Sequence, residues 1–212
     1  MRKAFVIVPS GVEVDPSGDR DISRITKHIV SRTIVVMTRQ CIGEGVFIAG
    51  KIVTSTVLVR NEQLVSIILP HRRRAQAVVA RRDEINHIAE LKQVSLLSGD
   101  QSIVVAAGRC PINTRQIGHV GSPLLIADSA SGKPVVSVAG MSYHINVCER
   151  REEDSWAMLP NLPRGLSGGG IWNIDGEFVG MSLASRKPYF DRERSRILAL
   201  RAEDVMNFAE SS

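Results

Sequence analysis

A serine between glycines is the clearest candidate for chemistry in this sequence. It is Ser167, in the run Gly165-Leu166-Ser167-Gly168-Gly169. Glycines on both sides let the backbone turn sharply and point successive N–H groups into one small cavity, which is what an oxyanion hole requires. Two apolar residues and a turn at 173–177 follow, so we predict a loop entering a β-hairpin and not the strand-to-helix elbow of an α/β-hydrolase. By itself the run is equally compatible with a plain hairpin loop.

The loop and its surroundings resemble the nucleophile loop of trypsin-like serine proteases of the chymotrypsin fold, especially the bacterial high-temperature-requirement (HtrA/Deg) branch. In that family a glycine, any residue and Ser-Gly-Gly, usually followed by proline, precede such a hairpin, and here Gly170 replaces the proline. Three further segments resemble the family. Residues 45–54 resemble the strand pair before the family's histidine loop, 121–124 a Gly-Ser-Pro-Leu turn, and 197–209 the last strand with its closing helix. The resemblance spans roughly residues 22 to 209.

Two positions of the catalytic triad differ from the family pattern. The segment that would carry the histidine corresponds to residues 52–59 and places Val57 in the histidine position. The segment that would carry the aspartate corresponds to residues 87–92 and places His87 there. A serine hydroxyl attacks only when a base within reach removes its proton, and valine cannot take a proton. The resemblance therefore implies a pseudoprotease, in which Ser167 is a remnant nucleophile and no catalytic residue is active.

Short β-strands must position these residues. Apolar, β-branched runs separated by turn residues predict two sets of six strands, at 33–38, 45–49, 51–59, 63–69, 75–80 and 88–94, and at 102–107, 117–126, 134–147, 170–174, 177–184 and 196–200. Apolar residues that share one face predict helices at 22–30 and 202–209, the second with Val205, Phe208 and Ala209 facing inward.

We therefore predict an all-β fold of two six-stranded β-barrels, the chymotrypsin-like double barrel, with an N-terminal and a C-terminal helix. A polar break at 95–101 separates the two sets of strands. We predict a single domain. It consists of an N-terminal arm and helix (1–32), a first barrel (33–98), a second barrel (99–200) and a C-terminal helix (201–212).

A protease cleft is also a peptide-binding groove, because a substrate pairs with an exposed sheet edge and inserts a side chain into a pocket. The resemblance places the oxyanion-hole remnant at Gly165 and Ser167, and the peptide groove at Ser182, Leu183, Ala184, Leu162 and Arg164. We therefore predict that the protein is not an enzyme but binds a protein or peptide partner, as a scaffold or regulatory subunit.

Three other interpretations stay open. His87 could swing across the gap left by Val57 and reach Ser167, which would make a serine endopeptidase with a non-standard arrangement. The groove could be vestigial and the fold a spacer. Arginine clusters at 72–74, 81–82, 150–151 and 192–196 could bind nucleic acid, but aromatic residues make up only 4% of the chain, and solvated loops are the simpler explanation for the clusters.

Composition predicts a folded protein that depends on no disulfide, metal, cofactor or membrane. The 212 residues are 43% apolar, which is enough for a core, and the net charge of +5 permits an acidic partner without requiring one. The odd number of cysteines, at no metal-like spacing, fits a reducing compartment, and we expect no metal and no cofactor. No apolar run approaches the roughly 20 residues that cross a bilayer. We expect a cytoplasmic protein without membrane contact, and the sequence indicates no oligomeric state.

Overall fold

The chain folds into two six-stranded β-sheets and two α-helices. The computed structural model describes residues 18–96, 110–112, 123–128, 135–144, 155–159, 167–186 and 196–211. The first half contains α1 (Gly18–Arg32), β1 (Thr33–Met37), β2 (Ile42–Ile48), β3 (Lys51–Ser55), β4 (Leu64–Leu69), a short 3-10 helix η1 (Pro70–Arg72), β5 (Arg73–Asp83) and β6 (Ile88–Leu96). The second contains β7 (Pro123–Asp128), β8 (Val135–His144), β9 (Ser155–Leu159), β10 (Gly170–Trp172), β11 (Phe178–Arg186), β12 (Arg196–Arg201) and α2 (Ala202–Glu210).

The first six strands close into a barrel. They pair in the order β1-β2-β3-β6-β5-β4, and β1 pairs with β4 to complete the ring. Alternating burial along β4 shows which face forms the interior. In β4, Val65, Ile67 and Leu69 are buried whereas Leu64 is exposed, so one face of the strand forms the barrel interior. The predicted first barrel is confirmed, with all six of its strands.

One boundary of this barrel differs from the prediction. The strand predicted at 51–59 ends at Ser55, because β6 accompanies β3 only to the pair Ser55 and Ile88. The following residues form turns that fold the apolar run back, and Leu58 and Val59 are buried in the barrel core. Burial without a β partner therefore explains the apolar character that predicted a strand.

The second sheet contains the last six strands. They pair in the order β10-β11-β12-β9-β8-β7, and pairing of β10 with β7 joins the two ends of this series. The sequence did not predict β9, which has only five residues. The strand predicted at 102–107 lies outside the described residues.

Both predicted helices are present. α1 is longer than the predicted 22–30, and its Ile29 is fully buried in a core cluster with Trp172 and Phe178. In α2, Val205, Phe208 and Ala209 are buried, as predicted. Neither described helix is long and apolar enough to span a membrane.

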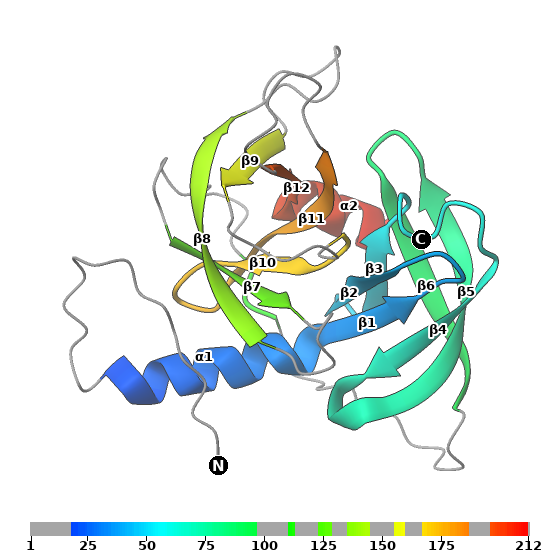
Figure 1. The fold of residues 1–212 in the computed structure, drawn as a ribbon, viewed down its shortest axis with the longest axis horizontal. Coiled ribbons are helices and arrows are strands. Elements are labelled where there is room, and N and C mark those ends of the chain that lie inside the picture. Colours follow the sequence, from blue (N-terminus) through cyan, green and yellow to red (C-terminus); the bar gives the residue numbers. More distant parts are fainter. Residues whose placement is uncertain are drawn as a thin grey trace.

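A single core cluster, called here the shared core, joins the first barrel, the second sheet and α2. It contains Ile48, Val53 and Ile88 from the barrel, Met181, Leu183 and Leu200 from the second sheet, and Val205 and Phe208 from α2. α2 packs against β3 and β6 on one side and β11 and β12 on the other, and Figure 1 shows this helix between the two sheets. The relative position of the two halves near their junction therefore depends on buried apolar contacts.

The turn between β2 and β3 generates a stability prediction. Ala49 and Gly50 have φ angles of 49° and 77°, the pattern of a type I′ hairpin turn. Asparagine occupies this turn position readily, whereas alanine there costs roughly 1 kcal/mol. We expect Ala49→Asn to raise the free energy of unfolding by about 0.5–1 kcal/mol, measured by urea denaturation. Ala49→Val is the opposite control and should destabilise, and a loss of stability in Ala49→Asn would contradict the turn geometry.

Candidate functional site

Main-chain hydrogen bonds from both halves hold the loop that carries Ser167. The N–H of Glu44 in β2 donates to the carbonyl oxygen of Ser167 at 2.9 Å. On the other side, the N–H of Gly168 donates to the carbonyl of Ser182 at 2.7 Å, and the N–H of Ser182 donates to the carbonyl of Gly169 at 2.8 Å. The loop therefore lies between β2 of the barrel and β11 of the second sheet.

Gly168 fits this place only because it lacks a side chain. Its φ is +88°, and a Cβ atom would lie 2.2 Å from the carbonyl oxygen of Glu44 and 2.3 Å from Oγ1 of Thr54. Those two atoms are fixed by each other, since Thr54 Oγ1 donates to the Glu44 carbonyl at 2.6 Å. Both the backbone conformation and the available space therefore require glycine here.

Glu44 is a residue at the site that the sequence analysis missed. Its side chain is buried, and a Cβ atom on Gly169 would lie 2.3 Å from the carboxylate oxygen Oε2. The only sequence signal is one acidic residue in the otherwise apolar and glycine-rich strand 42–48. The carboxylate therefore packs directly against the serine loop.

The hydroxyl of Ser167 has a main-chain acceptor. Its Oγ donates a hydrogen bond to the carbonyl of Leu183. The pairing register between β11 and β12 shifts between Ser182 and Ala184, so Leu183 is the extra residue of a β-bulge. A peptide carbonyl is not a base at neutral pH, so this hydrogen bond orients the hydroxyl without activating it.

Val57 lies in the turn after β3, close to the serine loop. Its N–H donates to Oγ of Ser55 at 3.2 Å, and a Cβ atom on Gly168 would lie 2.9 Å from the Ser55 nitrogen. The next residue, Leu58, packs its side chain against Gly43. Gly43 is also close to the serine loop, because a Cβ atom added to it would lie 2.9 Å from the Ser167 carbonyl oxygen. Val57 itself is 50% exposed, so its aliphatic side chain contributes to the surface of this turn.

His87 ends the turn between β5 and β6 and lies beside the Val57 turn. Its carbonyl accepts the N–H of Thr56 at 3.0 Å, which extends the β3–β6 pairing by one residue. The preceding turn is organised by Asp83, whose Oδ1 accepts the N–H groups of Ile85 and Asn86, both at 3.0 Å. His87 has a φ of 57°, a left-handed conformation that is uncommon for residues other than glycine, although histidine adopts it more often than most.

The structure thus brings the segments of Val57, His87 and Ser167 to one junction. Leu162, Arg164 and Gly165 lie outside the described residues, as does the rest of the segment before Ser167. Within the described part of the chain, the hydroxyl hydrogen bond of Ser167 goes to Leu183, and the main chain of His87 pairs with Thr56.

The predicted groove residues Ser182 and Leu183 have buried side chains. Ser182 Oγ accepts the N–H of Gly169 at 3.0 Å, and both main-chain groups of Ser182 already bond to the serine loop. The Leu183 side chain is only 5% exposed and belongs to the shared core. The first part of the predicted edge is therefore occupied by the chain's own loop.

The predicted solvated loop is wrong for the arginine pair at 81–82. Both residues lie in β5 and bind main-chain carbonyls. Arg82 donates to the carbonyls of Val59, at 3.2 Å, and Glu62, and so holds the turn that follows Val57. Arg72 and Arg74 are exposed, whereas 150–151 and 192–195 lie outside the described residues.

The described residues contain no group of three or more His, Cys, Asp or Glu side chains that could hold a metal ion. Burial raises the pKa of the Cys110 thiol to about 11, an effect that outweighs the lowering by the positive charge of Arg32. This thiol is therefore protonated at neutral pH and is a poor nucleophile.

The close fit of Gly168 generates a prediction with a matched control. We expect Gly168→Ala to destabilise the fold by about 4 kcal/mol or more, because the added methyl group meets two fixed oxygen atoms in addition to the φ strain. Gly50→Ala has nearly the same strain, at φ +77°, but no atom within 4 Å of the added carbon. It should cost only about 1–2 kcal/mol. Equal losses in urea denaturation would show that the space at Gly168 is not as tight as the structure indicates.

Comparison with solved structures gives the same fold. A serine-to-alanine mutant of Rv3671c from M. tuberculosis H37Rv, in an inactive form, is similar with a TM-score of 0.69 and 13% identity, over 97% of this chain and 94% of that chain. Rv3671c protease in an inactive form is similar with a TM-score of 0.66 and 14% identity, over 92% and 95%. No family model and no curated protein matches this sequence. At these identities the likeness shows the fold alone, which this chain shares with the Rv3671c protease.

Proposed function

We propose that this protein is a catalytically inactive member of the trypsin-like protease fold that binds a protein or peptide partner. The observation that carries the proposal is the hydrogen bond from Ser167 Oγ to the Leu183 carbonyl, beside an exposed Val57. The hydroxyl proton is held by a group that cannot accept it, and the nearby turn presents an aliphatic side chain. Without a general base, a serine loses nearly all of its reactivity toward peptides.

The strand pairing of the second sheet, together with the likeness to the Rv3671c protease, supports the finer architecture that we propose. The second sheet is the second barrel of a chymotrypsin-like double barrel, because its strands pair in a ring order and β7 meets β10. The whole chain then forms one protease-like domain, with the serine loop at the seam between its barrels.

Partner binding in such a cleft uses main-chain pairing with an exposed strand, together with pockets for side chains. Ser182 is already paired with the serine loop, and the Leu183 carbonyl accepts the Ser167 hydroxyl, so we place partner pairing on β11 from the Leu183 N–H onward to Ala184. The exposed Val57 forms an aliphatic wall on the barrel side. A bound peptide would therefore lie between the β11 strand and the Val57 turn, with Leu162 and Arg164 as candidate pocket residues. The proposed role is that of a cytoplasmic scaffold or regulatory subunit.

The first prediction of this proposal concerns catalysis. We expect the purified protein to show no hydrolysis of casein or of labelled peptides above the level of Ser167→Ala, because no base assists the hydroxyl. Fluorescence release over a broad peptide set measures this. Turnover that Ser167→Ala abolishes would overturn the proposal and favour a serine endopeptidase in which His87 acts as the base.

The second prediction concerns binding. A random-peptide library displayed on phage and selected on the immobilised protein should yield binders that Val57→Arg weakens at least tenfold, because the longer charged side chain occupies the cleft wall. The tenfold change corresponds to about 1.4 kcal/mol. Since Val57 is 50% exposed, the fold should tolerate this change.

Ile174→Arg is the matched control, because Ile174 is 55% exposed in the hairpin turn after β10, beside α1. It should leave binding intact, as should Ser167→Ala. Selection of no binders, or equal weakening by both arginine variants, would contradict binding in the cleft. Weakening by charge reversal at Arg72 and Arg74 alone would place the partner on the basic surface instead.

A further inference from the structure

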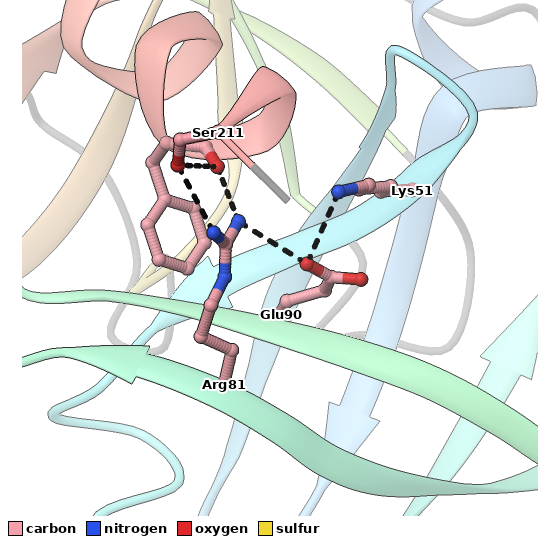
Figure 2. Close-up of polar contacts among 5 residues, drawn as sticks. Lys51, Arg81, Glu90 and Ser211 are labelled. Atoms are coloured by element: carbon pink, nitrogen blue, oxygen red, sulfur yellow. Dashed lines mark hydrogen bonds and ion pairs between the residues drawn. The ribbon is translucent and has the colours of Figure 1, made fainter.

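The side chain of Arg81 joins the end of α2 to the first barrel. Its guanidinium donates to the carbonyl of Phe208 and, at 3.0 Å, to Oγ of Ser211, and its central carbon lies 4.0 Å above the centre of the Phe208 ring. The same group forms an ion pair with Glu90 at 3.3 Å, and Glu90 pairs with Lys51 at 3.4 Å. Figure 2 shows Arg81 between the helix end and the strands that carry Glu90 and Lys51.

These contacts satisfy groups that a helix end leaves open. The last carbonyls of an α-helix have no partner within the helix, and the negative end of the helix dipole favours a cation there. Arg81 meets both requirements with one planar group, while Ser211 Oγ also donates to the Phe208 carbonyl at 3.0 Å. The Arg81 side chain is 30% exposed, so solvent screens its ion pair with Glu90, and the hydrogen bonds to α2 are the main contribution.

α2 in turn touches the residues that support both sides of the candidate site. Val205 and Phe208 pack in the shared core with Leu183, whose carbonyl holds the Ser167 hydroxyl, and with Ile88, which directly follows His87. A displacement of α2 would therefore reach the serine loop through Leu183 and the His87 turn through Ile88.

We propose that Arg81 is a positioning residue for the candidate site: by fixing the end of α2 on the first barrel, it sets how β11 and the Ser167 loop lie against β2 and β3. This role is independent of whether the cleft binds a peptide, so it goes beyond the proposed function. In the simpler alternative, Arg81 only caps α2, and its loss loosens the helix end while the serine loop stays unchanged.

Amide hydrogen exchange of the full-length protein, read by mass spectrometry of peptides, distinguishes these two roles. We expect Arg81→Met, which keeps an unbranched apolar stem over Phe208, to speed exchange of the Gly168 and Ser182 amides on the order of tenfold. Both amides donate hydrogen bonds between the Ser167 loop and β11, next to the bond from the Glu44 N–H of the first barrel to the Ser167 carbonyl. Exchange at the end of α2 should rise in parallel. Arg81→Lys keeps the charge but not the planar group, and should lie between the wild type and Arg81→Met.

A variant that destabilises the protein about as much as Arg81→Met, but far from α2, shows whether faster exchange comes from lost positioning or from lower overall stability. Val65 is buried in the interior of the first barrel, in a different core cluster from α2. Val65→Ala should lower the melting temperature without selectively speeding exchange at Gly168 and Ser182. If Arg81→Met does not fold, Ser211→Ala is the milder test, because it removes only one of the Arg81 contacts, and it should produce a smaller change of the same pattern.

Faster exchange confined to α2, with unchanged Gly168 and Ser182 amides in both Arg81→Met and Ser211→Ala, would overturn the positioning role. An equal effect of Val65→Ala on these two amides would overturn it as well.

Discussion

The close approach of Gly168 to the first barrel is the constraint on which the candidate site depends. The Glu44 carbonyl and the Thr54 hydroxyl leave no space for a side chain, and the N–H of Gly168 bonds to Ser182 on the opposite side. One residue thus contacts both halves of the molecule within a few ångströms. The backbone of Ser167, the position of its hydroxyl and the bulge at Leu183 all follow from this fit.

Because packing explains the glycines of the loop, their presence does not by itself indicate catalysis. A Gly-x-Ser-Gly-Gly pattern is interpreted as a nucleophile loop because glycines allow an oxyanion hole. Here the positive φ of Gly168 and its close packing already require glycine, whether or not an oxyanion hole is used. Gly169 likewise lies against the buried side chain of Glu44. In this protein these glycines let the serine loop pack against the first barrel, whether or not a base is present. Activity must therefore be argued from the groups around the hydroxyl, of which the described residues show the Leu183 carbonyl.

Much of the fold could be predicted from sequence because it depends on local patterns. Alternation predicted the first barrel, and a helical apolar face predicted Val205 and Phe208 as buried residues of α2. The end of β3 could not be predicted, because burial of Leu58 in a turn gives the same apolar signal as a strand. The roles of Arg81 and Glu44 depend on partners more than 100 residues away in sequence, at Phe208 and at Gly169, and a local reading of charge favours solvated loops. The family resemblance assigned Val57, His87 and Ser167 to one site, a prediction that composition and periodicity could not make.

The central claim is that no base assists the Ser167 hydroxyl, and the pH dependence of its reaction with a fluorophosphonate tests this most directly. The rate of Ser167 labelling, followed by intact mass with Ser167→Ala as the blank, would be measured across the neutral range. Without a base, the rate should rise about tenfold for each pH unit, because only the alkoxide formed by hydroxide reacts. A rate that levels off above an apparent pKa near that of histidine, about 6.5, would show that an imidazole assists the serine and would contradict the account.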